Sequence, residues 1–159
     1  MPIDPDATTY YRQARFSTRL PNAYRYTRSH FWISEPAPGV LRVGMTKFAT
    51  RMLGDFVEFR FEVTANEIVK VGQPIGSIEG FKAVSELYSA VDGEFVGENR
   101  ELAEHPDLVD SDPYDQGWLY QVRGSPGPDA LDVNGYIDVL DATIERMLAE
   151  TKAQEDRTC

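Results

Sequence analysis

Residues 72–94 read GQPIGSIEGFKAVSELYSAVDGE, and this stretch holds two short apolar runs on either side of a lysine. Residues 75–79 and 84–88 are each predicted to form a strand, because both runs are short, apolar and bounded by turn residues. Residues 80–83 then form the turn of a hairpin, with Lys82 at its tip. A lysine in that position exposes its ammonium group to solvent, where an enzyme can acylate it, although most turn lysines have no such role.

Short strands separated by turns are predicted on both sides of this hairpin. Residues 57–61 alternate between apolar and charged side chains, which is the pattern of a strand with one buried face. Asp92 and Gly93 are predicted to form a tight turn, and residues 110–117 a loop. Many short strands at this spacing indicate a mainly β fold, a small barrel or sandwich. The remaining predicted strands are residues 30–33, 40–43, 69–74, 94–96 and 118–123.

Three helices are predicted around these strands, one of them a short helix that Asn99 caps and that stops before His105. Thr46 is a candidate N-cap for a short helix with an apolar face, and Gly54 is expected to end that helix in a left-handed conformation. Near the C-terminus, apolar residues recur every three or four positions, which predicts one amphipathic helix over residues 132–148 that packs on the body. We expect the chain to fray from Thr151 onward. The residues of this helix expected to face the body are Ile137, Leu140 and Ile144.

Composition excludes several classes of protein. The chain has 159 residues, of which 42% are hydrophobic, so it can bury a core and is not disordered throughout. A net charge of −10 argues against nucleic acid as a partner. Cys159 is the single cysteine and the two histidines lie far apart, so neither an internal disulfide nor a familiar zinc site is expected. Without a secretory signal or a membrane-length apolar run, we expect a cytoplasmic protein that binds no membrane.

The charge is distributed unevenly along the chain. Five arginines fall in the first 30 residues, whereas the rest of the sequence is strongly acidic. This basic arm is either a partner contact or a solvated extension lying on the acidic body. We therefore predict three parts: a basic N-terminal extension at residues 1–28, a main domain at 29–123, and a linker with the C-terminal helix at 124–159.

The motif around Lys82 resembles the lipoyl-bearing hairpin of the glycine cleavage system H protein, and the resemblance runs from about Ser29 to Arg123. Biotinyl domains differ, because they more often place methionine on both sides of the lysine, where this chain has Phe81 and Ala83. Further matches in the same order are Ser29-His30, Trp32, residues 43–46, residues 53–55, residues 108–109, residues 111–114 and Gly117-Trp118.

This resemblance implies a barrel-sandwich hybrid fold and lipoate bound covalently to Lys82 through an amide. It also implies a non-catalytic carrier, whose tethered arm meets the active sites of partner enzymes at high effective concentration. The partners would include a lipoate ligase or octanoyltransferase. Glu79 and Glu86 flank the hairpin, and they either assist its recognition by that enzyme or are solvated charges at the strand edges. The residues expected around the cofactor, besides Lys82, are Glu79, Gly80, Phe81, Ala83, Phe31 and His30.

Two departures from the family pattern bear on the cargo. The family usually has a glutamate between histidine and tryptophan, and it helps to hold the amine of the aminomethylated arm; here Phe31 stands there. The family also usually reads Glu-Ser-Val-Lys where residues 79–82 read Glu-Gly-Phe-Lys. A sulfur cargo needs no carboxylate counter-ion. We therefore favour a sulfur carrier like the H-protein-like lipoate-binding protein of bacterial sulfur oxidation, which serves a heterodisulfide-reductase-like complex.

Other functions stay open at this point. One alternative is the ordinary H protein, which carries the aminomethyl group of glycine for the glycine cleavage enzymes. Others are an assembly or moonlighting protein that has lost lipoate, and a binding module whose lysine is never modified and whose C-terminal helix is the working surface. We do not expect an enzyme, because no catalytic triad order, phosphate-binding loop or metal spacing appears.

Overall fold

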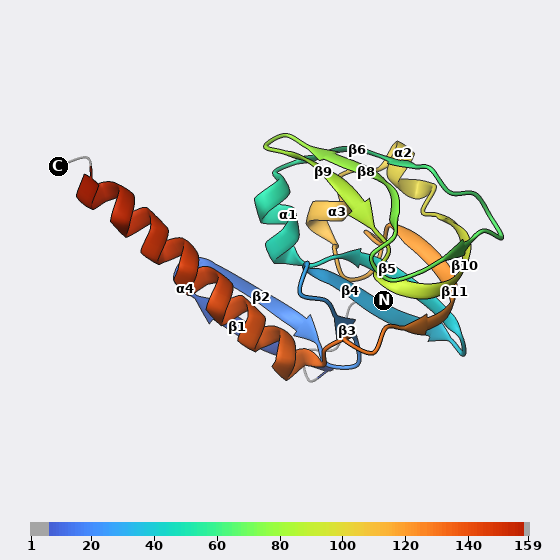
Figure 1. The fold of residues 1–159 in the computed structure, drawn as a ribbon, viewed down its shortest axis with the longest axis horizontal. Helices are drawn as coiled ribbons and strands as arrows, with labels where there is room; N and C mark the ends of the chain where they lie inside the picture. The colour runs from blue at the N-terminus through green and yellow to red at the C-terminus, as the bar shows by residue number, and fades with distance from the viewer. Residues whose placement is uncertain (1–6, 158–159) are drawn as a thin grey trace.

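The computed structural model describes residues 7–157, and its largest element is a six-stranded antiparallel sheet (Figure 1). Its central strands alternate between buried and more exposed side chains, so one face of the sheet covers a core. In spatial order the strands are β3 (Arg25–Tyr26), β4 (Phe31–Ala37), β5 (Val40–Met45), β11 (Tyr120–Pro126), β10 (Val91–Glu98) and β7 (Ile68–Val69).

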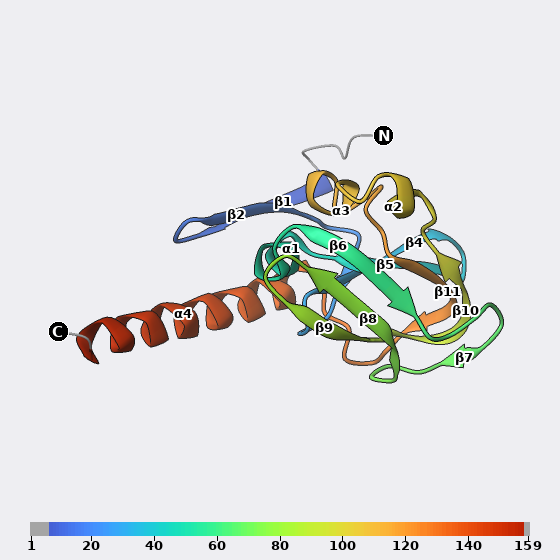
Figure 2. The same ribbon diagram turned by 90° about the horizontal axis from the view of Figure 1, so that it is seen from above.

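A second sheet has three strands and carries the predicted hairpin. It consists of β6 (Phe56–Phe61), β8 (Pro74–Gly80) and β9 (Val84–Tyr88), with β8 in the middle. Figure 2 shows this sheet lying over the larger one. Side chains from both sheets share one apolar core, so the mainly β sandwich expected from the sequence is confirmed.

Three short helices connect the strands: α1 (Lys47–Leu53), α2 (Glu101–Glu104) and α3 (Leu108–Ser111). α1 begins as predicted, because the Ala49 N–H donates to Oγ1 of Thr46 at 3.3 Å. It also ends as predicted at Gly54, where φ is +80°, although ψ of −168° is not that of a left-handed helix.

Several local predictions were wrong. Residues 70–73, predicted to belong to a strand over residues 69–74, form the turn between β7 and β8. Asp92 and Gly93 lie inside β10, where Gly93 pairs with both Val69 and Gly124. A Cβ on Gly93 would lie 2.3 Å from the Arg123 carbonyl oxygen, so this glycine permits close backbone approach between strands. Gly124, the partner of Gly93, permits the same close approach, and residues 124–126, predicted as linker, extend β11. Residues 108–111 form α3, so the predicted loop at 110–117 begins two residues later than expected.

The basic N-terminal extension and the C-terminal helix form a unit of their own. β1 (Thr8–Gln13) and β2 (Phe16–Pro21) make an antiparallel hairpin, which the sequence did not predict. This hairpin and α4 (Val133–Arg157) lie side by side in both ribbon views, and Tyr11 Oη donates to Asp141 Oδ1 at 2.8 Å (Figures 1 and 2). The division of the chain into three parts stays a prediction, although β3, within the predicted extension, belongs to the main sheet.

A second apolar core joins this unit to the body. It contains side chains from the hairpin, from α1 and from α4, and the Tyr26 and Tyr136 rings stack at 4.8 Å. As predicted, Leu140 and Ile144 are buried, and Ile137 packs against this core. The predicted fraying from Thr151 was wrong, since α4 stays helical to Arg157, through residues that favour helices.

Candidate functional site

Lys82 lies at the tip between β8 and β9, and its side chain is exposed. Main-chain hydrogen bonds to the end of α1 and the residues after it fix the backbone of this tip. The Phe81 N–H donates to the Asp55 carbonyl at 2.7 Å, and the Lys82 N–H donates to the Leu53 carbonyl at 3.0 Å. The Gly80 N–H donates across the turn to the Ala83 carbonyl at 2.8 Å. A free ammonium is thus presented on a rigid base.

Gly80 lets the hairpin lie directly against the end of α1. A Cβ added to Gly80 would lie 2.3 Å from Leu53 Cγ and 2.4 Å from the Leu53 carbonyl oxygen. Any larger residue would therefore push the tip away from the carbonyl that anchors Lys82. Glu79, the preceding residue, is half-buried on β8 and pairs with Val84.

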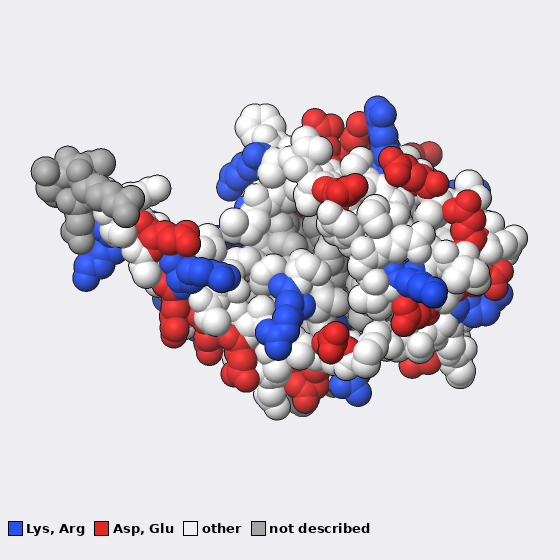
Figure 3. Space-filling model, in the orientation of Figure 1, with Lys and Arg blue, Asp and Glu red and all other residues white. Residues whose placement is uncertain are grey.

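An open cleft of about 340 Å³ lies beside the tip, between α1 and β9. Figure 3 shows the surface hollowed there. Most of its wall is apolar, and His30, Phe31 and Ala83 all line it. The other lining residues are Ser29, Met45, Ala49, Met52, Leu53, Ile78, Ser85, Glu86 and Tyr88.

His30 is fixed in the cleft wall by a buried hydrogen-bond network. The Tyr136 hydroxyl lies 2.8 Å from His30 Nδ1 and 2.8 Å from Thr46 Oγ1. His30 also has a φ of +72°, which turns the chain into β4. Burial lowers the pKa of His30 to about 4, so the imidazole is neutral at physiological pH.

The free energy of unfolding should fall with decreasing pH, because a proton on the His30 imidazole favours the unfolded chain. Because the folded pKa lies below the ordinary value, only the unfolded chain binds this proton between pH 6.5 and about 4. The stability contributed by the neutral His30 is fully present above pH 6.5, and about 3 kcal/mol of it is lost as the pH falls to 4. The variant His30→Asn removes the titrating group, so the free energy of unfolding measured with urea should depend less on pH across this range. Asparagine is chosen because it tolerates the positive φ at this position. His105→Asn is the control, and equal pH dependence in wild type and His30→Asn would contradict the assignment.

The cleft holds one carboxylate among its lining residues. Glu86 extends from β9, and its Oε2 accepts a hydrogen bond from Tyr88 Oη at 2.8 Å. This hydrogen bond and the negative charge of Glu86 raise the pKa of the Tyr88 phenol. With His30 neutral, the charge of the cleft wall is negative and comes from Glu86.

A separate hollow of about 300 Å³ lies on the other side of the tip. Lys82 and Phe81 line it together with Arg51 of α1 and two carboxylates, Asp55 and Asp110. Burial raises the pKa of Asp110, and the Phe56 N–H opposes that shift by donating to its Oδ2. The Phe81 ring itself is 84% exposed, so the tip presents an apolar ring next to the ammonium group.

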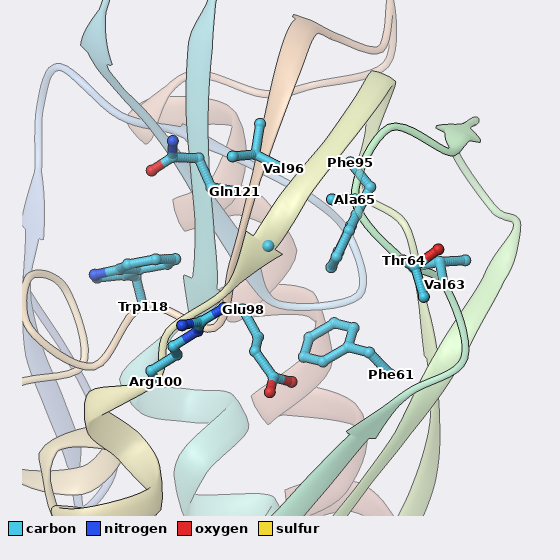
Figure 4. A pocket seen from close by; sticks show the side chains of 11 residues that line it. Phe61, Val63, Thr64, Ala65, Phe95, Val96, Glu98, Arg100, Trp118 and Gln121 are labelled. Carbon is cyan, nitrogen blue, oxygen red and sulfur yellow. The ribbon is translucent and has the colours of Figure 1, made fainter.

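A third hollow, of about 530 Å³, lies away from Lys82 (Figure 4). Phe61 and Phe95 stand on one side of it and Trp118 on the other. In the pairing of β6 with β8, Phe56 lies opposite Gly80 at the tip and Phe61 lies at the far end. This hollow therefore does not belong to the site around Lys82.

The structure gathers most of the residues that the sequence singled out. His30, Phe31 and Ala83 share the cleft, Phe81 and Lys82 share the neighbouring hollow, and Gly80 lies beneath the tip. Sequence reasoning missed Met45, Met52, Ser85 and Tyr88 in the cleft wall. Alternation along β9 places Tyr88 on the same face as Glu86 and is the signal that could have found it. Nothing in the sequence indicated that Tyr136 contacts His30.

Residues 7–157 contain neither a membrane-spanning helix nor a cluster of metal ligands. No helix there is long and apolar enough to cross a membrane. No three His, Cys, Asp or Glu side chains in that range gather closely enough to hold a metal ion. Cys159 lies outside the described residues.

The main body of the chain is similar to known proteins. The family model for the glycine cleavage H-protein matches residues 24–134. The glycine cleavage system H protein of Streptomyces avermitilis is 38% identical over 119 residues, which are 74% of this chain and 94% of that protein. The H protein of Rubrobacter xylanophilus is 41% identical over 117 residues, covering 74% and 91% of the two chains.

A solved structure agrees with these sequence relationships. The crystal structure of a glycine cleavage system H protein from Mycobacterium marinum superposes with a TM-score of 0.66 and 32% identity. It covers 74% of this chain and 95% of its own. The chain therefore belongs to the glycine cleavage H-protein family, as its sequence led us to expect.

Proposed function

We propose that this protein is a glycine cleavage H protein, a non-catalytic carrier with lipoate in amide linkage on Lys82. The observation that carries the proposal is the exposed Lys82, anchored beside an apolar cleft that contains one carboxylate. When bound, the lipoyl dithiol supplies a sulfur that holds the aminomethyl group derived from glycine and delivers it between the glycine cleavage enzymes.

The residues around Lys82 suit such an arm. A lipoyl chain is hydrocarbon for most of its length, and it gains free energy by leaving water for an apolar surface. Met45, Met52 and Leu53 supply that surface in the cleft, while Phe81 extends it at the tip. Because the tip backbone is held by the α1–β6 connection, the lysine stem can swing while its base stays fixed.

Phe31 lies in the cleft wall and cannot pair with an ammonium group, but the cleft is not without a counter-charge. Glu86 faces the same space from β9 and can accept hydrogen bonds from a cationic amine. The neutral His30 adds no opposing positive charge. We infer that Glu86 holds the cargo amine in this protein.

The sulfur cargo favoured by the sequence receives less support. It rested on the loss of a carboxylate at position 31, and Glu86 leaves the cleft a carboxylate of its own. The relatives described above are glycine cleavage system H proteins by name, so they favour the alternative that the sequence left open. Neither the cleft nor the names of these relatives support a heterodisulfide-reductase-like partner. The proposed partners are the glycine cleavage enzymes and a lipoate ligase or octanoyltransferase.

The proposal is tested by loading the lipoylated protein. It is incubated with glycine and the glycine decarboxylase of the same organism, with a parallel incubation containing a sulfane sulfur donor. Intact-mass spectrometry should show an aminomethyl adduct in the first incubation. Sulfur transfer without an aminomethyl adduct, while a known H protein loads normally, would refute the glycine function.

Glu86→Gln, compared with wild type after both are fully lipoylated, is expected to weaken retention of the cargo. A hydrogen bond to a charged group contributes about 1.5–3 kcal/mol, so the loaded arm should lose its cargo about tenfold faster or more. The release rate is measured by mass spectrometry after the decarboxylase is removed. Glu62→Gln is the control, because Glu62 is also exposed but does not line the cleft. Equal release rates for both variants would exclude Glu86 as the counter-charge.

A further inference from the structure

The β1–β2 hairpin presents a cationic face to solvent. Side chains alternate along both strands, so Tyr11, Phe16 and Leu20 are buried toward α1 and α4. The opposite face, together with the turn, is exposed. The residues of this cationic face are Tyr10, Arg12, Arg15, Ser17 and Arg19.

The arginines of this face stand in a stretch of sequence without acidic residues. From Ala7 to Arg28 the sequence contains five arginines and no Asp or Glu. Among residues 7–157 no ion pair involves Arg12, Arg15 or Arg19, although Arg19 lies over the Tyr10 ring at 5.4 Å. The remainder of the protein is acidic, so these guanidinium groups form an isolated positive surface.

The hairpin that carries this cationic face packs, through its buried face, against α1, the helix beside the lysine tip. Arg51 of α1 stacks over the Phe16 ring of the hairpin at 5.8 Å, and the same arginine lines the hollow beside Lys82. A protein that encloses the Lys82 tip therefore approaches the hairpin across the width of one short helix. The hairpin also precedes the region matched by the family model, which begins at residue 24.

We propose that the cationic face docks an acidic surface of the glycine cleavage enzyme that receives the Lys82 arm, an inference that rests on the proposed function. Planar guanidinium groups pair with carboxylates in a bidentate manner, and complementary charge speeds and orients encounter. Nucleic acid fits less well, because a strongly acidic body would be repelled by a polyanion. Pairing of two hairpin edges is disfavoured, because it would bring arginines of two copies together.

The test compares binding with loading for the full-length lipoylated protein. Affinities for the purified glycine decarboxylase, aminomethyltransferase and dihydrolipoyl dehydrogenase of the same organism are measured at several salt concentrations. The variant Arg12→Glu/Arg15→Glu/Arg19→Glu is compared with a control of equal charge change, Lys70→Glu/Arg100→Glu/Arg123→Glu. A third variant replaces the three hairpin arginines with lysine. Circular dichroism melts establish that each variant is folded.

The hairpin reversal should weaken binding to at least one enzyme by about tenfold or more at low salt, with a smaller effect at high salt. The control should change affinity less, and the lysine variant should retain most of it. The proposal is overturned if both reversals act equally, if none of the enzymes binds, or if the hairpin affects only binding to DNA or phosphatidylglycerol vesicles. Hairpin-dependent binding without loading would refute the glycine function alone. Normal loading together with unchanged affinity of the hairpin reversal for all three enzymes would refute the docking surface alone.

Discussion

Replacing Lys82 with arginine is expected to abolish both lipoylation and cargo loading. Arginine keeps the positive charge and the length of the side chain, but its guanidinium group is not acylated by enzymes that form a lysine amide. The tip backbone should be unchanged, because its hydrogen bonds to Leu53 and Asp55 come from main-chain atoms. Intact-mass spectrometry after incubation with a lipoate ligase, lipoate and ATP measures the effect directly.

Lys70→Arg is the matched control, because Lys70 is also exposed and lies in a turn between two strands. It should be lipoylated as fast as wild type and should load normally. If Lys82→Arg still gains the lipoyl mass while folded, the attachment site is elsewhere. Loss of modification in Lys70→Arg would contradict the assignment equally.

Gly80→Ala is expected to have the second-largest effect, because it displaces the tip that presents the lysine. The added methyl group would lie 2.3 Å from Leu53 Cγ and 2.4 Å from the Leu53 carbonyl oxygen, which also anchors Lys82. Backbone atoms cannot move aside as a flexible side chain can. We expect a loss of about 1–3 kcal/mol in the free energy of unfolding, together with a lower rate of lipoylation.

Gly97→Ala supplies the comparison for this variant. Gly97 lies in β10, and a Cβ there would meet no atom within 4 Å. Its melting temperature and lipoylation rate should match wild type. The steric argument fails if the two variants melt alike, and the positioning argument fails if Gly80→Ala is destabilised but lipoylated at the normal rate.

Local patterns were enough to predict the hairpin and its lysine. Strands β8 and β9 are short apolar runs separated by a three-residue turn, and α1 has both a cap and a stop in its sequence. These signals depend on neighbours within a few residues, so the sequence carries them openly. The order of matched motifs around Lys82 then indicated the family.

Features that depend on distant contacts could not be predicted in the same way. Gly93 looked like a turn residue because its role, close approach to the Arg123–Gly124 backbone, involves a strand 30 residues away. The β1–β2 hairpin lacks a typical turn signal and is supported by packing on α1 and α4. Local patterns also do not show that Phe31 and Glu86 share one cleft, because they lie on strands of different sheets.

The central claim is that Lys82 carries lipoate, and the most direct test examines the protein as its own cells make it. The untagged protein is purified from that organism and digested, and the peptide containing residue 82 is sequenced by tandem mass spectrometry. We expect a lipoyl amide on Lys82 and unmodified side chains at Lys47, Lys70 and Lys152. An unmodified Lys82 in cells whose other lipoyl proteins are fully lipoylated would contradict the account.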